Sequence, residues 1–290
     1  VLVIAGVPYV LLSANSSLVQ VLVAGRRHRQ TSQAGDVYRL YALSNAGSLI
    51  GLLSYPFFVE PFLGLTEQWY GFALLTLLYA GLFCVCARLS DTGAVCDQKT
   101  GEPCPAENEC AQSGAGGQPT GRAAWYWLVL PGLSCFLLNA VTAYLTTDLT
   151  PMPLVWVFLL ALFLLSYIIG FSRVGERGVP YFGGLMLVFI FVSAILLPQN
   201  KGNMFFLVLW PALGLLFSGG LFLHGWLYRL RPADAVLTKF YLNVALGGTL
   251  GGCFSGLLAP VLFSSVVEYP LILALLVLMG SIYLWGERER

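Results

Sequence analysis

The chain is divided into long apolar segments, which are separated by short stretches rich in polar residues, proline or glycine. An α-helix needs about 20 residues to cross the roughly 30 Å hydrocarbon core of a bilayer. We predict nine spans, at residues 2–24, 37–58, 68–88, 124–146, 152–172, 179–198, 204–228, 239–262 and 268–285. Lipid offers no hydrogen-bond partner to backbone N–H and C=O groups. These spans are therefore expected to be helices, in which the backbone groups bond each other. The pattern predicts an all-α, polytopic transmembrane bundle of about nine helices (eight to ten).

Composition supports the same conclusion. Hydrophobic residues make up 58% of the 290 residues and charged residues only 10%, whereas soluble domains carry about 25% charged residues. So apolar a chain needs lipid to cover its surface, which makes the bilayer its first predicted partner. The net charge of +1 gives no reason to expect nucleic acid as a partner.

Basic residues follow every second predicted span. They are Arg26, Arg27, Arg29, Arg88, Lys99, Arg122, Arg173, Arg177, Arg229, Arg231, Lys239, Arg288 and Arg290. Lys201 is the one basic residue on the other side. By the positive-inside rule we predict a cytoplasmic C-terminus and an external N-terminus. Because the sequence starts at Val1 inside an apolar run, we expect a signal peptide or a further helix upstream.

One long connection, residues 89–123, interrupts the single transmembrane domain predicted for residues 1–290. It contains Cys96, Cys104 and Cys110 and a run rich in glycine, serine and proline, a composition typical of a flexible loop. The spacing of these cysteines and of Cys84 and Cys86 fits neither a zinc site nor an iron–sulfur site. We therefore predict no metal.

Small residues recur along the eighth predicted span, as Gly247, Gly248, Gly251, Gly252 and Gly256. Pairs of small residues four apart allow two helix backbones to approach closely in lipid. We interpret this stripe as a helix-packing face and place the second and eighth spans at packed interior positions. A phosphate-binding loop is disfavoured because no strand precedes the glycines.

Several polar residues lie within the predicted spans or at their ends. They are Ser44, Asn45, Asn139, Asp148, His224, Arg229 and Asn243. Two interpretations stay open: hydrogen bonds between helices, or a route for a substrate or a proton. His224 is too short to reach the headgroups, as Arg229 does. We predict that it faces the interior and bonds the eighth or second span.

Two carboxylates, Glu60 and Glu268, lie on the predicted outer side and make it acidic together with Asp148. Either they are ordinary loop residues in contact with water, or they form an entrance that attracts cations. The sequence also contains an approximate repeat. A shift of 203 residues aligns Pro8 with Pro211 and Arg26 with Arg229, which indicates a six-helix unit and a major-facilitator-like plan.

Catalytic motifs are missing from this sequence. It has no G-x-S-x-G, no Walker lysine motif and no H-E-x-x-H, and its two histidines, His28 and His224, offer no bis-histidine haem site. We therefore predict no cofactor and no catalytic residue.

Taken together, several stretches resemble the membrane region of bacterial fused spermidine-synthase-like proteins, also described as major-facilitator/spermidine-synthase fusions. They are residues 38–48, Tyr55-Pro56, Glu60-Pro61, residues 145–153 with Trp156, His224-Gly225, Arg229, Pro232, residues 238–242, the glycines between Gly247 and Gly252, Ala259-Pro260 and residues 268–270. The resemblance implies a protein of the bacterial inner membrane. Members of that family often carry a cytoplasmic aminopropyltransferase-like domain, which is absent from these 290 residues.

Two functions remain in competition. The first is a transporter-like or small-solute-binding membrane domain, for which the acidic outer side and the repeat argue. The second is a non-transporting anchor or subunit, whose partners would be other membrane subunits or a cytoplasmic aminopropyltransferase-like domain.

Overall fold

The structure is a computed structural model that describes residues 35–91, 121–146, 153–197, 205–232, 236–263 and 267–289. Every regular element in these ranges is a helix, as the sequence predicts. The first predicted span, residues 2–24, and most of the connection at 89–123 lie outside them. The described helices form two compact units, one made largely of α2 and α3 and the other of α5 to α11.

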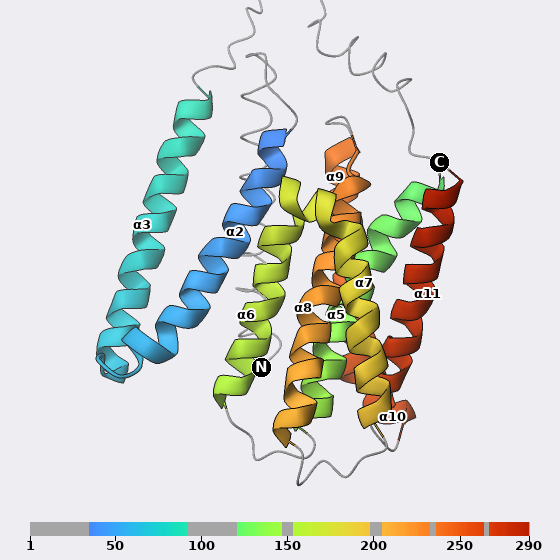
Figure 1. The fold of residues 1–290 in the computed structure, drawn as a ribbon. Helices are drawn as coiled ribbons and strands as arrows, with labels where there is room; N and C mark the ends of the chain where they lie inside the picture. Colours follow the sequence, from blue (N-terminus) through green and yellow to red (C-terminus); the bar gives the residue numbers. More distant parts are fainter. Residues whose placement is uncertain are drawn as a thin grey trace, which may run out of the picture. The chain divides into compact units, whose positions relative to one another are not determined.

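The first unit is a helical hairpin (Figure 1). Helix α2 spans Gly35–Ser54 and continues into a π-helical turn at Tyr55–Val59, and α3 spans Leu65–Asp91. Side chains fix the turn between them: the Tyr55 hydroxyl donates to Gln68 Oε1 (3.2 Å), and the Gly64 N–H donates to Glu67 Oε2 (2.9 Å). The apolar side chains along both helices are exposed, among them Phe72 and Leu82.

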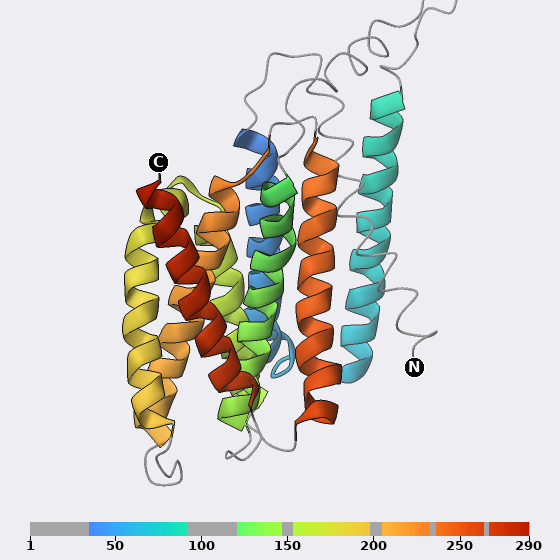
Figure 2. The same cartoon turned by 90° about the vertical axis from the view of Figure 1, so that its right-hand side faces the viewer.

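The second unit is a bundle with α8 at its centre. Its helices are α5 (Gly121–Thr146), α6 (Pro153–Gly170), α7 (Arg173–Leu196), α8 (Phe205–Arg229), α9 (Leu237–Cys253), a π turn (Phe254–Leu258), the short α10 (Ala259–Leu262) and α11 (Glu268–Arg288). Helix α8 packs against α5, α6 and α7, while α9 packs against α5. Helix α11 packs on α5 and α7 and is inclined to its neighbours (Figure 2).

Seven of the described helices are long and apolar enough to cross a bilayer. An eighth apolar helix, Leu154–Gly170, is shorter. This set of helices fits a polytopic membrane protein, and each predicted span after the first coincides with a described helix. Because lipid tails are as apolar as a leucine side chain, the large apolar side chains exposed on these helices suit contact with lipid.

The glycine stripe of α9 forms the tightest helix contact of the bundle. Gly247 lies against the backbone of Leu128, and Gly251 against the backbone of Gly132, so any side chain at either glycine would overlap with α5. A Cβ added at Gly248 would lie 3.4 Å from Cys135 Sγ, whereas one added at Gly252 or Gly256 would meet no atom of a neighbouring element within 4 Å among the described residues. Among the described residues, the closest packing of the stripe is therefore that of Gly247 and Gly251 on α5. In α2, a Cβ added at Gly47 or Gly51 would likewise meet no such atom within 4 Å in the described part of the chain.

One predicted boundary is wrong. The Gly178-Val179-Pro180 sequence was expected to separate two spans, but α7 already begins at Arg173 and contains all three residues. The helix starts early because Ser172 caps it, with its Oγ accepting from the Gly175 N–H (3.2 Å). A proline is tolerated near a helix start if the carbonyl that loses its intrahelical donor finds another.

Candidate functional site

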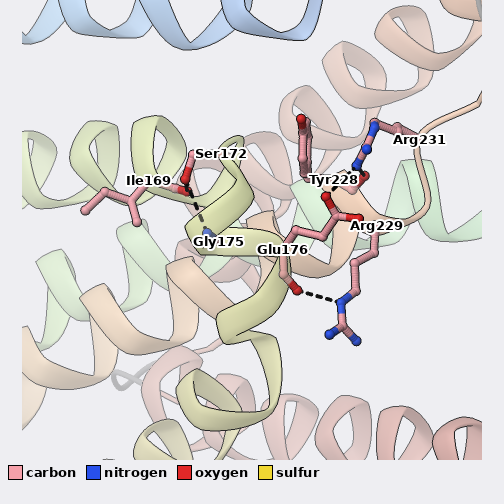
Figure 3. Close-up of polar contacts among 7 residues, drawn as sticks. All are labelled: Ile169, Ser172, Gly175, Glu176, Tyr228, Arg229 and Arg231. Carbon is pink, nitrogen blue, oxygen red and sulfur yellow. Dashed lines mark hydrogen bonds and ion pairs between the residues drawn. The ribbon is translucent and has the colours of Figure 1, made fainter. Parts of the chain in front are cut away.

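Polar side chains gather at both ends of the α5–α11 bundle. We call the end where α8 and α11 finish the Arg229 end, and the end where α11 begins the Glu268 end. Figure 3 shows the first of these. The two ends are about 28 Å apart along α11, because 19 residues separate Glu268 from Glu287 and an α-helix rises by about 1.5 Å per residue.

At the Arg229 end, one guanidinium joins three helices. Arg229, the last residue of α8, donates from Nε to the Glu176 carbonyl of α7 (2.6 Å) and from Nη1 to the Tyr283 hydroxyl of α11 (2.6 Å). Its Nη1 also lies 3.4 Å from Glu287 Oε1. Because a guanidinium presents several donors in a fixed fork, it can hold these groups simultaneously. The predicted polar role of Arg229 is therefore a contact between α7, α8 and α11.

The Glu176 carbonyl is available to Arg229 because of Pro180. In an α-helix the carbonyl of residue 176 would accept the N–H of residue 180, and proline has none. A backbone carbonyl without a donor is costly at membrane depth. The Nε–H of Arg229 replaces the missing donor (Figure 3). A proline on α7 and an arginine on α8 therefore depend on each other.

Arg231 supports the same corner. Its Nη1 lies 3.1 Å from Glu176 Oε2 and donates to the Tyr228 carbonyl (2.9 Å), and its guanidinium lies 4.0 Å above the centre of the Tyr228 ring. Arg229 thus bonds the backbone of Glu176, while Arg231 bonds the side chain of the same residue (Figure 3). Both charges at this corner have opposite charges within reach.

His224 lies about one turn inward from Arg229 and is fully buried. Its Nδ1 is 3.1 Å from Ser166 Oγ of α6, and its ring stacks on Tyr167 with centroids 3.5 Å apart. The Ser166 hydroxyl already donates to the Phe163 carbonyl (2.7 Å). Since a hydroxyl has one proton, this assigns the proton of the Ser166–His224 bond to Nδ1. The other nitrogen, Nε2, then carries a lone pair that has no partner among the described residues.

The predicted partner of His224 was wrong, although the side chain does face the interior. The bond goes to α6 rather than to the eighth or second span. Glycines without side chains allow α6 and α7 to approach α8 closely here. A Cβ on Gly170 of α6 would lie 2.5 Å from His224 Cβ, and a Cβ on Gly225 of α8 would lie 2.8 Å from the Gly175 carbonyl of α7. These two close approaches bring α6 and α7 onto α8 at this level.

At the Glu268 end, α11 begins with a buried acidic residue. Glu268 is 7% exposed, and its Oε2 has no hydrogen-bond partner in the described part of the chain. The next residue, Tyr269, donates from its hydroxyl to Ser193 Oγ of α7 (3.0 Å). Its ring stacks on Tyr144 of α5, with centroids 3.9 Å apart and planes 3° from parallel. Three helices therefore meet here around an aromatic pair, and Glu268 directly precedes one of its two tyrosines on α11.

Of the two alternatives for Glu268, that of an ordinary loop residue in contact with water is wrong, because its side chain is buried. Glu60 differs: it is exposed and directly follows the π turn Tyr55–Val59. Sequence treats the two carboxylates alike, since each stands beside a proline or an aromatic residue at a span end. Burial separates them, and only Glu268 belongs to a helix interface.

The other predicted polar residues have separate places. Asn139 of α5 donates to Ser255 Oγ beyond α9 (2.7 Å), which is a hydrogen bond between helices. Asn243 is half-buried on α9, and Ser44 and Asn45 lie on α2 in the first unit. Asp148 and Lys201 lie outside the described residues. Sequence reasoning missed the four partners Ser166, Ser193, Ser255 and Tyr283, whose only signal is a polar residue inside an apolar run.

Metal-ligating side chains do not cluster in the described ranges: no group of three histidine, cysteine, aspartate or glutamate residues could hold an ion there. Comparisons with protein-family models, curated proteins and solved structures gave no match. The resemblance to fused spermidine-synthase-like proteins therefore stays a prediction, and function has to be argued from the geometry.

Proposed function

We propose that this chain is a small-solute-binding, transporter-like membrane domain. The observation that carries this proposal is the buried Glu268 carboxylate with an oxygen that no described group bonds. Burying a polar group without a partner is costly, and burying an ionised one more so. Proteins accept such a cost chiefly where a buried ionisable group serves a function.

The rest of the bundle makes a purely structural explanation of Glu268 less attractive. Asn139, Ser193, Tyr269 and Arg229 each bond a group on another helix. These bonds already join α5, α7, α8, α9 and α11. Glu268 contributes to none of these bonds, so the burial of its carboxylate favours a role in binding.

A major-facilitator-like plan with a six-helix repeat belongs to the same proposal. Helices α2 and α9, which the shift of 203 residues aligns, share a local feature. Each runs into a π-helical turn next to a proline, Pro56 after α2 and Pro260 after α9. Prolines favour such turns because they lack the donor of a regular helical bond.

The proposed orientation puts the Arg229 end in the cytoplasm of a bacterial cell and the Glu268 end outside. It is supported by the basic residues Arg173, Arg177, Arg229, Arg231 and Arg288, which all lie near helix ends at the Arg229 end. Labelling of single cysteines introduced at Arg288 and at Glu60 with a membrane-impermeant reagent, in intact cells and in lysed cells, tests this orientation.

The experiment that tests solute binding is a thermal-shift screen of the purified chain in lipid nanodiscs. Binding to the folded state raises the melting temperature by mass action. We expect at least one class of small solute to do so in a saturable way. If neutral, anionic and cationic solutes all leave the melting temperature unchanged, the proposal is wrong.

A second candidate function is a non-transporting anchor or subunit, and the α2–α3 hairpin favours it. The candidate membrane span of α3, Leu65–Cys86, is not buried by the described residues, so its apolar surface is available to lipid or to helices of other membrane proteins. This candidate predicts co-purification of specific membrane chains or of an aminopropyltransferase-like protein in mild detergent. Loss of that association on replacing Leu75 and Leu82 by alanine, with the α5–α11 bundle intact, would support it.

A further inference from the structure

We propose that Glu268 anchors a binding site for a small organic ammonium ion at the Glu268 end of the bundle. The inference rests on the proposed solute-binding function and names the class of solute. It starts from the cost of the carboxylate: the side chain is more than nine-tenths buried, and Oε2 has no hydrogen-bond donor among the described residues. A buried anion needs a counter-charge, or it must give up its charge by taking a proton.

The start of α11 supplies only part of this counter-charge. Glu268 lies in the first turn of a 21-residue helix, where free backbone N–H groups carry a partial positive charge. The residue at the N-cap position, Val267, has no side-chain acceptor for the first backbone N–H groups, and no described N–H bonds Glu268 Oε2. The helix start therefore favours a negative charge here but leaves the carboxylate able to bind a cation.

The described basic side chains do not reach this carboxylate. Among the described residues of the bundle, the ion pairs are Arg229–Glu287 and Arg231–Glu176, and both lie at the Arg229 end. That end is about 28 Å away along α11. Lys201 lies outside the described residues, so the experiment below includes it as the rival partner from within the chain.

The surroundings of Glu268 favour an ammonium ion over a metal ion. Calcium and magnesium bind to six or more oxygen atoms, of which several are usually protein carboxylates. In the described ranges no three metal-ligating side chains come together. The neighbouring oxygens of Tyr269 and Ser193 already bond each other. An ammonium group, in contrast, needs one carboxylate and donates hydrogen bonds to it directly.

Buried apolar residues follow Glu268 on α11. Tyr269, Ile272 and Leu273 are buried, and so is Tyr144, which stacks on Tyr269. Such an apolar part of the bundle disfavours a strongly hydrated ion and tolerates a short alkyl chain, so small alkylammonium ions are the class of solute that we propose.

The test measures the melting temperature of the purified chain in nanodiscs with methylammonium, n-butylammonium, sodium or an uncharged alcohol, at matched ionic strength. We expect both ammonium ions, and neither of the others, to raise the melting temperature by several degrees. Glu268→Gln should abolish the increase. Glu60→Gln, which removes an exposed carboxylate of the same predicted side, is the matched control and should retain it.

Other outcomes overturn the inference in recognisable ways. An equal effect of sodium means a general cation site, and stabilisation by uncharged or anionic solutes alone refutes the ammonium class while leaving the solute-binding function standing. No effect of any solute refutes both. If the ammonium ions raise the melting temperature only of the Lys201→Met variant, the chain's own lysine pairs with Glu268 and the inference is wrong.

A second measurement applies if Glu268→Gln folds poorly. Equilibrium dialysis of isotope-labelled methylammonium against the wild-type chain then decides, because the inference requires saturable binding that n-butylammonium displaces and sodium does not.

Discussion

The two ends of the α5–α11 bundle treat charged groups differently. At the Arg229 end, two arginines bond Glu176, Tyr283 and Glu287. The contacts of Arg229 join α8 to α7 and to α11, and the ion pair of Arg231 joins the segment after α8 to α7. At the Glu268 end, a carboxylate is buried beside a stacked tyrosine pair, and one of its oxygens has no donor among the described residues. Both ends are built from the same helices, α7 and α11, so the difference lies in the side chains.

This difference separates what stabilises the bundle from what is available for binding. A charge with several good partners strengthens the fold, and removing it leaves those partners without bonds. A buried charge without partners weakens the fold, and removing it relieves the cost of burial. The same kind of substitution should therefore have opposite signs at the two ends.

The largest effect is expected for Arg229→Met. Methionine keeps much of the apolar stem but removes the donors to the Glu176 carbonyl and the Tyr283 hydroxyl. Hydrogen bonds to charged groups contribute about 1.5–3 kcal/mol each, and breaking a buried ionic contact costs more. We expect a loss of about 2–4 kcal/mol in the free energy of unfolding, measured by denaturant unfolding in mixed micelles. A loss below that of an ordinary exposed substitution would show that this end is not held by Arg229.

Glu268→Gln should have the opposite sign in the absence of any solute. Glutamine preserves the shape of the side chain and removes the charge, so the cost of burying an unpaired anion disappears. We expect the free energy of unfolding to rise by about 1–2 kcal/mol in the same micelles, the order of magnitude for burying a polar group without a hydrogen-bond partner. The exposed Glu60→Gln should change it by less than about 0.5 kcal/mol. A clear destabilisation by Glu268→Gln, but not by Glu60→Gln, would mean that the carboxylate has a partner in the folded chain.

The helices themselves could be predicted from the sequence because each span is a continuous apolar run of the required length. Residues 204–228 coincide with α8, and residues 268–285 with α11. The start of α7 could not be located in this way. Gly178 and Pro180 are common at helix ends, and only the cap at Ser172 together with the donor from Arg229 shows that they lie inside a helix here.

The polar residues of the candidate site were recognisable by type, but their partners were not. His224 and Asn139 stand out as polar residues in apolar runs, and so do Ser166 and Ser255. Which of them meet depends on how the helices rotate and slide against each other, and glycine positions such as Gly170 and Gly247 decide this. Glu268 lies on α11, which packs on α5 and α7, so its burial likewise depends on how the helices pack. No local pattern at residues 268–270 indicates this burial.

The dependence between Pro180 and Arg229 gives a prediction of intermediate size. Pro180 is exposed, so Pro180→Ala removes little packing and restores an N–H that can bond the Glu176 carbonyl. In the Pro180→Ala background, Arg229→Met should therefore be less harmful than in the wild type. We expect a coupling of about 1 kcal/mol in a double-mutant cycle of unfolding free energies. Additive effects would mean that the carbonyl of Glu176 does not depend on Arg229.

The smallest effect is expected for Arg231→Met, at the same end as Arg229. Arg231 forms an ion pair with Glu176 and lies over the Tyr228 ring, but about a third of each charged side chain is exposed (31% and 34%). Exposed ion pairs contribute about 0–1 kcal/mol, and an exposed contact of a cation with an aromatic ring adds about 0.5–1 kcal/mol. We expect a loss of about 1 kcal/mol in the free energy of unfolding, well below that of Arg229→Met, measured by the same unfolding experiment.

Arg231→Lys is the matched control. It keeps the charge but loses the stacking of the guanidinium on the Tyr228 ring, so it should recover only the salt-sensitive part of the loss. If Arg231→Met costs as much as Arg229→Met, the side chain of Glu176 rather than its carbonyl holds α7 to α8, and the proposed dependence on Pro180 is wrong.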